Sequence, residues 1–456
     1  MQKLGFKRNL WFGFAIWLIL VGCTAVSEPT PTPAPPTVTA VPTPEPTVIP
    51  SGLYVDALAP IGEINPLVYG TNYGPWLFIN IDIQEEFEAS GLTFFRFPGG
   101  RYGDSNNVRP LQIDQLMDLA ETIDAEVTIS VRMLGGTPEA AAELVRYTNI
   151  EKEYNVRYWS IGNEPSLYID LQGEEEWDTA FYNEQWRIFA EAMEAVDPSI
   201  ELIGPNIHQF LADEDARPKD PSGHDWLREF LIANGDMVDV VSIHRYPFPL
   251  SRVDPLPEIE DLRQNSREWD DIIPALRQEI RDITGRDMPI GVMEINSNWS
   301  NASLGEATPD SYYNAIWWGD VLGRMINQEV DMVTHFALQH PTAGWGMFGR
   351  TEPRPTYYVY RLYQHMGDEL LFSETDDDLV SVVAARRDDG ALTVMLINLG
   401  DDALTKPLTI RGLEGTTAVS TYRLAPDQFA EEIGETDISS GVELLGQSMT
   451  LLIFDN

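Results

Sequence analysis

The chain has 456 residues, 43% of them hydrophobic, which is enough for one large domain and a smaller one. Its 72 acidic residues outnumber 30 basic ones and give a formal net charge of -42. Such a surface repels nucleic-acid phosphates and anionic lipid headgroups, which excludes a nucleic-acid partner and disfavours a strongly polyanionic substrate. The single cysteine, Cys23, excludes an intrachain disulfide.

The N-terminal segment has the pattern of an export signal. Basic residues within the first eight positions precede an apolar run, 10–22, that is too short for a comfortable membrane span. The run leads into LVGC, which resembles the bacterial lipobox, and this resemblance implies that Cys23 is lipidated and becomes the mature N-terminus. We therefore predict a signal peptide at 1–22 and an exported, membrane-anchored lipoprotein of the bacterial cell surface. An uncleaved signal anchor is the alternative.

A segment rich in proline and threonine follows, Ser27–Pro50. Proline lacks the amide donor and favours extended polyproline II, so this segment cannot build a core. At ~3.1 Å per residue it reaches roughly 75 Å. We therefore predict that residues 23–50 are a linker that holds a folded domain away from the membrane.

Strand-like and helix-like segments alternate from about Leu53 onward. Short apolar runs predict strands that begin near Asn65, Leu92, Glu126, Val156, Ile200, Val238, Met288 and Val330. The helix-like segments that follow them are 81–90, 111–123, 138–148, 179–196, 224–233, 258–283, 311–328 and 356–366. Eight such repeats over about 300 residues favour a (β/α)8 barrel, an α/β fold, over an open parallel sheet. We assign the barrel to residues 51–367.

The last part of the chain, 368–456, has a different pattern. Alternating apolar segments such as LVSVVAARR and ALTVMLINLG are separated by turn signals such as RDDG, and no long helical pattern occurs. This pattern predicts a C-terminal antiparallel β-sandwich domain that packs on the barrel. The segment Gly52–Ala57 is a candidate for an additional strand of this domain.

Polar residues gather where the predicted barrel strands end, which is where barrel enzymes place their chemistry. In chain order they are Asn72, Tyr73, Arg96, Arg132, Asn163, Glu164, Asn206, His208, His244, Tyr246, Glu294, Asn296, His335, Gln339 and His340. Two of them, Glu164 and Glu294, occupy equivalent positions on the fourth and seventh strands. A retaining glycosidase needs two carboxyl groups about 5–5.5 Å apart, one protonated and one ionised. A single glutamate at a strand end is more often a capping or ion-pairing residue, but two at matching positions favour catalysis.

The motifs GNEP, which contains Glu164, and MEIN, which contains Glu294, resemble those of the clan A glycoside hydrolases. The resemblance implies that Glu164 is the acid/base and Glu294 the nucleophile. It also implies that Asn163 holds the sugar 2-hydroxyl, and that Arg96 and Tyr246 hydrogen-bond the nucleophile. Both donors would favour the ionised form of Glu294.

The family within the clan is not resolved by these motifs. INPLVYGTNYG and RFPGG look like the family 51 α-L-arabinofuranosidases and the family 44 endoglucanases, whereas GNEPSLY looks equally like families 39 and 79. Several of these families have asparagine after the paired glycines, where this chain has Arg101. The acidic composition favours a neutral glycan.

Other features receive weaker assignments. His244 is evenly balanced between a substrate contact and a packed core histidine, and His208, His335 and His340 are expected to be structural or rim residues. GWGMFG, 344–349, lacks the strand before it that a dinucleotide site requires, and no metal-ligand motif such as H-E-x-x-H occurs. The aromatic residues of this segment, Trp345 and Phe348, are candidates for stacking on a sugar, and so are Trp76 and Trp299. Core packing is the alternative for all four.

The prediction is therefore a retaining glycoside hydrolase of arabinofuranosidase, xylosidase or endoglucanase type, with no cofactor and no metal. The predicted substrate-binding residues are Asn72, Tyr73, Arg96, Asn163, His244, Tyr246, Asn296, Gln339 and Trp345. The alternatives are a catalytically silent glycan-binding lipoprotein and a transglycosylase that uses the same site.

Overall fold

The computed structural model describes residues 50–169, 173, 176–249, 254–342, 344–413, 415 and 418–455. The predicted signal peptide, the lipidation site Cys23 and nearly all of the predicted linker lie outside the described residues. Within the described part of the chain, no helix combines the length and the hydrophobicity that crossing a membrane requires.

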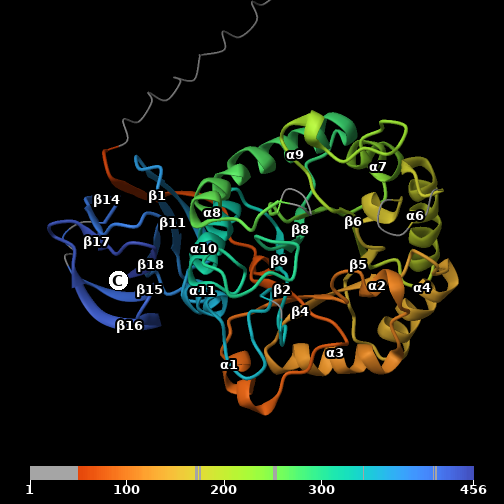
Figure 1. Ribbon diagram of the computed structural model, residues 1–456, viewed down its shortest axis with the longest axis horizontal. Helices are drawn as coiled ribbons and strands as arrows, with labels where there is room; N and C mark the ends of the chain where they lie inside the picture. The colour runs from red at the N-terminus through yellow and green to blue at the C-terminus, as the bar shows by residue number, and fades with distance from the viewer. Residues whose placement is uncertain are drawn as a thin grey trace, which may run out of the picture. The chain divides into compact units, whose positions relative to one another are not determined.

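Eight parallel strands close into a barrel, as the alternation of segments predicts (Figure 1). Each strand pairs with the next along the chain, and the first pairs with the last. The strands are β2 (Gly70–Asn72), β3 (Phe94–Phe97), β4 (Glu126–Val131), β5 (Tyr158–Ile161), β6 (Glu201–Ile207), β7 (Val240–Arg245), β8 (Ile290–Ile295) and β9 (Met332–His335). The ends of β5 and β8 therefore face each other across the same mouth, because all eight strands run in one direction.

Helices surround the barrel, and several of them begin at side-chain caps. The carboxylate or hydroxyl oxygens of Thr137, Asp178, Asp225 and Ser311 each accept a hydrogen bond from the third residue along the chain. The helices are α1 (Gln84–Glu88), α2 (Tyr102–Ser105), α3 (Pro110–Thr122), α4 (Pro138–Val145), α6 (Thr179–Glu194), α7 (Trp226–Asn234), α8 (Ile259–Asn265), α9 (Trp269–Thr284), α10 (Tyr312–Asn327) and α11 (Pro355–Tyr363). The segment 258–283, predicted as one helical stretch, is divided into α8 and α9 by a 3-10 turn at Ser266–Glu268.

Large apolar side chains fill one part of the barrel interior and leave the mouth to polar ones. The apolar cluster consists of Leu67, Phe94, Tyr158, Ile203, Val240, Met293 and Met332. The register between β7 and β8 is irregular, because Ile243 pairs with Val292 but His244 pairs with Glu294. The extra residue, Met293, lets two consecutive side chains of β8 serve the interior, so Met293 packs in the core while Glu294 lies in the site.

The C-terminal domain is built on an eight-stranded sheet of order β14-β1-β10-β11-β12-β18-β15-β16. Its strands are β14 (Leu408–Arg411), β1 (Leu53–Glu63), β10 (Glu369–Thr375), β11 (Val380–Arg386), β12 (Leu392–Asn398), β18 (Ser448–Phe454), β15 (Ala418–Ala425) and β16 (Gln428–Asp437), and a two-stranded sheet pairs β13 (Leu404–Lys406) with β17 (Val442–Leu444). All neighbours in the large sheet are antiparallel except β1 and β14.

Both faces of this sheet are buried, as the alternation of side chains along a strand requires. On β11, Val383 and Ala385 join the core shared with the barrel helices. Val382 and Ala384 instead pack in a second core, where Val442 and Leu444 of β17 cover them. The domain is therefore a sandwich on one face and a packing surface for the barrel on the other.

The N-terminal strand β1 belongs to this C-terminal sheet. It pairs with β10 on one side and with β14 on the other, and its red ribbon lies among blue strands in Figure 1. The predicted barrel boundaries, 51–367, include this strand, whereas the structure places it in the C-terminal sheet. The prediction of an additional sheet strand at Gly52–Ala57 agrees with this position.

Helix α10 forms much of the contact between the barrel and the sheet. The hydroxyl of Tyr312 donates to the carbonyl of Gln447 at 2.6 Å, and the side chain of Asn327 donates to the carbonyl of Val382 at 3.0 Å. Gly319 permits the close approach, since a Cβ there would lie 2.4 Å from the sulfur of Met449. The sheet is thus fixed on the barrel by packing and by hydrogen bonds.

Candidate active site

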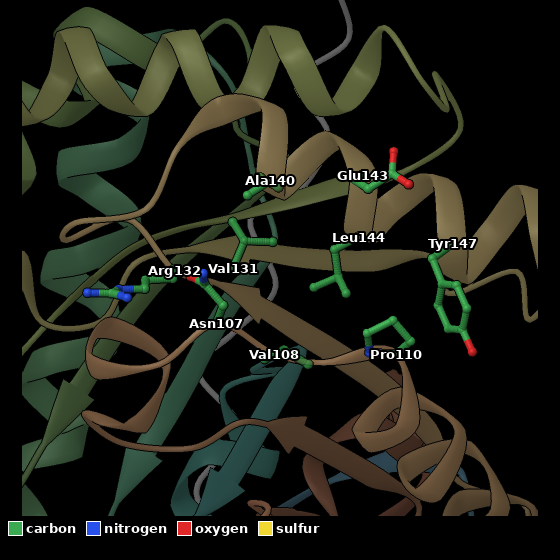
Figure 2. Close-up of a pocket in the computed structure, with 10 residues that line it drawn as sticks. Asn107, Val108, Pro110, Val131, Arg132, Ala140, Glu143, Leu144 and Tyr147 are labelled. Atoms are coloured by element: carbon green, nitrogen blue, oxygen red, sulfur yellow. The ribbon is translucent and has the colours of Figure 1, made fainter.

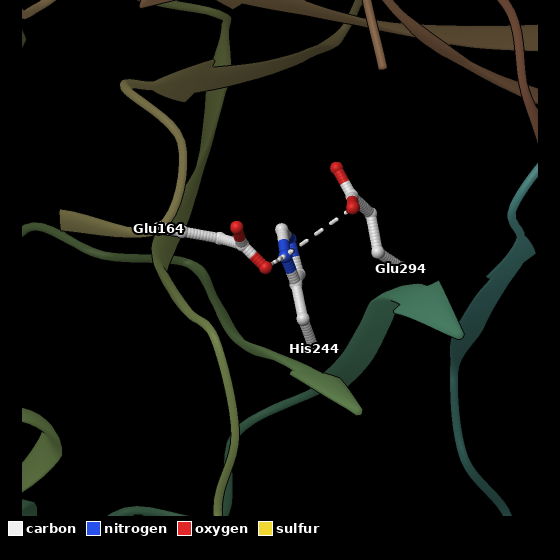
Figure 3. A group of neighbouring side chains, drawn as sticks. All are labelled: Glu164, His244 and Glu294. Carbon is white, nitrogen blue, oxygen red and sulfur yellow. Dashed lines mark hydrogen bonds and ion pairs between the residues drawn. The ribbon is translucent and has the colours of Figure 1, made fainter. Parts of the chain in front are cut away.

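Glu164 and Glu294 meet at the mouth of the barrel. Glu164 follows β5 in a left-handed backbone conformation with φ 48°, and its amide donates to the carbonyl of Asn206 at 3.0 Å. Glu294 is part of β8 and only 3% exposed. One carboxylate oxygen of each residue lies within 4.8 Å of the other, and Figure 3 shows the two side chains pointing toward the same space. This spacing is shorter than the roughly 6.5–9.5 Å that an inverting pair of carboxyl groups leaves for a water molecule.

Three donors hold the carboxylate of Glu294. Nη1 of Arg96 and the amide of Gly100 donate to Oε1 at 2.5 and 2.8 Å, and the hydroxyl of Tyr246 donates to Oε2 at 2.8 Å. Burial alone raises the pKa of Glu294, but the charges of His244 and Arg96 and the hydrogen bonds outweigh it, so this pKa lies below its usual value. Glu294 is therefore an ionised carboxylate in a fixed orientation, as attack on a carbon atom requires.

Arg96 is itself fixed by two asparagines. It is completely buried, and its Nη1 and Nη2 donate to the side-chain oxygens of Asn72 and Asn163 at 2.9 and 2.8 Å. The amide nitrogen of Asn72 is used as well, because it donates to the carbonyl of Met293 at 3.1 Å. Asn72 was predicted to bind substrate, but the structure gives it a supporting role beneath Arg96. By contrast, the side-chain nitrogen of Asn163 is buried with no hydrogen-bond partner among the described residues, so its capacity to donate is not used there.

His244 touches both glutamates. Its Nδ1 lies 3.1 Å from Oε1 of Glu164 and 3.8 Å from Oε2 of Glu294, as the dashed lines in Figure 3 show. The side chain is completely buried. The sequence left His244 evenly between a substrate contact and a core residue, and the structure places it as a buried partner of the carboxylate pair.

Glu164, His244 and Glu294 together have the residue types that bind a metal ion, and one ligand atom of each lies within 4.8 Å of the others. Both oxygens of Glu294, however, already accept hydrogen bonds from protein donors. A cation would have to replace some of these bonds and lie next to the guanidinium of Arg96. The donor set therefore does not fit a resident metal ion.

Two residues predicted to bind substrate are held by the protein itself. The side-chain nitrogen of Asn296 donates to the carbonyl of Phe336 at 2.6 Å, and its oxygen accepts from the amide of Ser297 at 2.7 Å. The side-chain nitrogen of Gln339 donates to the carbonyl of Gly349 at 2.9 Å. Both are buried, and these bonds give them structural roles in the loops after β8 and β9 that a motif cannot reveal.

Tyr73 also differs from its prediction. Its ring packs against Phe95 and Phe97, with centroid distances of 6.1 and 5.7 Å. Side chains alternate along a strand, so these two phenylalanines lie on the opposite face of β3 from Arg96. Tyr73 therefore packs outside the barrel interior and not beside Glu294.

The aromatic candidates divide into two groups. Phe348 is completely buried in the main core, which decides for core packing, the alternative to a sugar platform. Trp345 is partly buried, with its Nε1 donating to the carbonyl of Asn298 at 2.9 Å. Trp76 and Trp299 are 43% and 39% exposed and remain candidates for stacking on a substrate.

The other three histidines at the predicted strand ends have structural surroundings. His335 is completely buried beside Trp318, and burial lowers its pKa to about 3. Nδ1 of His208 lies 2.8 Å from the hydroxyl of Ser166, and burial is the main reason that the pKa of His208 falls to about 4. The ring of His340 contacts that of Trp345 edge-on. These positions agree with the expected structural and rim roles.

Arg132, at the end of β4, lines a separate cavity of about 220 Å³ (Figure 2). The cavity lies between β4, α4 and the segment that leads into α3, with Arg132 at one end and Tyr147 at the other. Its lining is mostly apolar and includes neither Glu164 nor Glu294. It is therefore not the space between the two carboxylates.

A parallel barrel with facing carboxylates after β5 and on β8, joined to a β-sheet domain, is a fold that solved glycoside hydrolases of families 51 and 44 also have. The chain is similar to the family 51 α-L-arabinofuranosidase of Thermotoga petrophila, with 17% identity, a TM-score of 0.67, and coverage of 89% of this chain and 100% of that one. It is equally similar to a family 44 xyloglucanase of Paenibacillus polymyxa, with 14% identity, a TM-score of 0.70, and coverage of 89% and 99%.

Sequence comparison gives a shorter match. Over an alignment 162 residues long, the chain is 26% identical to α-L-arabinofuranosidase C of Emericella nidulans, and the match covers 27% of this chain and 31% of that protein. No model of a protein family matches the chain. The comparisons therefore establish the fold.

Replacing Arg96 by methionine tests the electrostatics of Glu294. The pKa of Glu294 in the folded protein lies below the usual 4.5, so its ion pair with Arg96 stabilises the fold at pH values above the pKa in the unfolded chain. This stabilisation is lost as the pH falls through the pKa in the folded protein. Without the guanidinium, Glu294 should protonate at higher pH. We expect the acid limb of the kcat/KM profile to move upward and the free energy of unfolding at neutral pH to fall by about 3–5 kcal/mol.

The matched control is Arg217→Met. Arg217 is also buried, and it forms an ion pair with Glu279, at 3.2 Å, in a part of the protein remote from the site. This control should lower stability and leave the acid limb in place. An acid limb that stays unchanged in Arg96→Met would show that Arg96 does not keep Glu294 ionised.

Proposed function

We propose that this protein is a retaining glycoside hydrolase. The observation that carries the proposal is the pair of carboxylates within 4.8 Å of each other, one of which is held ionised by Arg96, Gly100 and Tyr246. A purely glycan-binding protein has no need for two facing carboxylates with such different surroundings. The similarity to arabinofuranosidases and to a xyloglucanase supports the same class of reaction.

The proposed reaction has two displacement steps. In the first, Glu164 donates its proton to the glycosidic oxygen while Oε1 or Oε2 of Glu294 attacks the anomeric carbon, so the leaving group departs as an alcohol and a glycosyl ester forms. In the second, Glu164 accepts a proton from water, whose oxygen attacks the anomeric carbon and breaks the ester. Two inversions give net retention, and both carboxyl groups return to their starting protonation states.

The proposed substrate is a neutral plant or microbial glycan, cleaved by arabinofuranosidase, xylosidase or endoglucanase chemistry. The unpartnered side-chain nitrogen of Asn163 supports a contact with a sugar hydroxyl, in line with the 2-hydroxyl contact that the family resemblance implies. The exposed rings of Trp76 and Trp299 support stacking on sugar faces. The net charge of -42 disfavours a uronic-acid polymer.

A panel of aryl glycosides tests the function directly. Arabinofuranoside, xyloside, glucoside, galactoside and glucuronide substrates should include at least one neutral glycoside that releases its aryl group, and the first-formed sugar should have the anomeric configuration of the substrate by NMR. No release from any member would support a silent glycan-binding protein, and an inverted product would contradict the retaining mechanism. Transfer of the sugar to an added acceptor in preference to water would support a transglycosylase.

We also propose that the protein is an exported lipoprotein. The support is the sequence of the N-terminal segment, in which the apolar run 10–22 ends next to Cys23. In a bacterial host, the intact chain should incorporate labelled palmitate and partition with membranes, whereas Cys23→Ala should do neither. Labelling of Cys23→Ala equal to that of the intact chain would contradict this assignment.

A further inference from the structure

A second carboxyl group, that of Asp104, lies buried behind the acid/base residue and has no part in the reaction described above. Asp104 is on the short helix α2 and is only 2% exposed. Its Oδ2 is buried and has no hydrogen-bond partner among the described residues. A buried carboxyl oxygen without a partner costs free energy, so its retention at this place requires an explanation.

Asp104 is linked to the acid/base turn through one tyrosine. The hydroxyl of Tyr168 donates to Oδ1 of Asp104 at 2.8 Å and accepts from the backbone amide of Asn163 at 3.4 Å. Asn163 immediately precedes Glu164, so the chain of bonds ends on the peptide that carries the acid/base. The link therefore bears on the placement of Glu164, and not only on the packing of α2.

The turn is built around this hydroxyl. Gly162 has φ 77°, and a Cβ there would lie 2.8 Å from the Tyr168 hydroxyl oxygen. Glu164 itself has φ 48°, a conformation that costs free energy for a residue with a side chain. Such a conformation persists only where neighbouring contacts hold it, and the amide of Asn163 is one of the groups held.

The charged and titratable groups that face Asp104 come from several elements: Tyr168 after β5, Tyr182 of α6, Glu164, Arg96 of β3, and Arg132, whose Nε donates to the Asp104 carbonyl at 2.9 Å. Burial is the main cause that raises the pKa of Asp104 to about 7, and the charge of Glu164 acts in the same direction. The charge of Glu164 therefore opposes ionisation of Asp104, and the two carboxyl groups interact electrostatically.

We propose that Asp104 is a positioning residue for the acid/base: through Tyr168 it fixes the Asn163–Glu164 turn, and its buried carboxyl group couples electrostatically to Glu164. The proposal rests on the proposed function, because it assigns Asp104 a part in proton donation by Glu164. The carboxyl group does not touch the substrate and takes part in no bond change.

Two variants separate the two parts of the proposal. Asp104→Asn keeps an oxygen that can accept from Tyr168 but removes the group whose pKa burial raises to about 7, so the inflection that Asp104 adds to the kcat/KM profile near pH 7 should disappear. Tyr168→Phe keeps the charge and breaks the link to Asn163. It should lower kcat/KM by about tenfold for aryl glycosides with poor leaving groups, which need the proton, and leave dinitrophenyl glycosides nearly unchanged.

The matched control is Tyr363→Phe, which also deletes a buried hydroxyl. This hydroxyl donates to the carbonyl of Gly319, at 2.8 Å, in a part of the protein remote from the site. This variant should lower the melting temperature, and any change in its kcat/KM should be the same for all leaving groups. If Asp104→Asn keeps the wild-type pH profile, or if Tyr168→Phe loses activity equally on all leaving groups, the proposal is overturned. A wild-type protein that hydrolyses no dinitrophenyl glycoside would instead refute the proposed function itself.

Discussion

Glu294→Ala is expected to lower kcat by about 10⁴- to 10⁶-fold, because it removes the atom that forms the covalent intermediate. The hydrogen-bond donors around the vacated space remain, namely Arg96, Gly100 and Tyr246. They are arranged for an anion, so added azide should occupy this space and attack the anomeric carbon of a dinitrophenyl glycoside. One displacement replaces two, and the product should be a glycosyl azide of inverted configuration, identified by NMR.

The control for this variant is Glu279→Gln, because Glu279 is another buried carboxylate, paired with Arg217 and Arg228 between α7 and α9. Its loss should reduce stability without affecting turnover well below the melting temperature. Turnover close to that of the wild type in Glu294→Ala would contradict the assignment of Glu294 as the nucleophile.

Glu164→Ala should produce the complementary pattern. Proton donation contributes typically 10² to 10⁴ in rate, so kcat/KM for glycosides with poor leaving groups should fall by about that factor. A dinitrophenyl glycoside needs little protonation and should still form the glycosyl ester on Glu294. The ester then hydrolyses slowly without a general base, so rapid-mixing experiments should show a burst of dinitrophenol followed by slow turnover.

Azide again distinguishes the roles. In Glu164→Ala it attacks the ester from the face that water normally uses, so the glycosyl azide should have retained configuration. Retention here and inversion in Glu294→Ala together identify which carboxylate is which. The same configuration from both variants would contradict the assignment.

The barrel and the facing pair of glutamates are predictable from the sequence because both follow a repeated pattern. Eight alternating segments define the strands, and the position of Glu164 and Glu294 at two strand ends follows from counting them. The irregular register at Met293 is not readable, since periodicity alone places two consecutive residues of a strand on opposite faces. The MEIN motif identifies Glu294 without revealing how the strand turns it inward.

The supporting contacts are less predictable. Asn72, Asn163 and Asn296 have the same side chain at the ends of three strands, yet only Asn163 keeps a buried nitrogen without a protein partner. Which asparagine is used internally depends on carbonyl groups far away in the sequence, such as those of Met293 and Phe336. Composition at strand ends therefore predicts a polar mouth, and the fold decides which of its members can reach a ligand.

The amide of Gly100 and the carboxyl of Asp104 are absent from the sequence-based site for a related reason. Glycine offers no side chain to notice, and Asp104 stands in a short polar helix that resembles any surface turn. The signal that was available is the GG in RFPGG, because closely spaced glycines often bring a backbone amide near an anion. Phe348 shows the same limit, since the sequence left an aromatic residue of a glycine-rich loop open between a sugar platform and core packing, and the fold places it in the core.

The position of β1 has a consequence for the order of folding. Leu53 pairs with Leu408 on one side and Thr375 on the other, so its partners are synthesised more than 300 residues later. During synthesis, β1 must wait unpaired until both β10 and β14 have followed it. Contacts so distant in sequence slow folding, because the entropy of closing the loop is lost before the contacts form. The sheet should therefore be the last part of the protein to become stable, and a chain shortened at either end should lose it first.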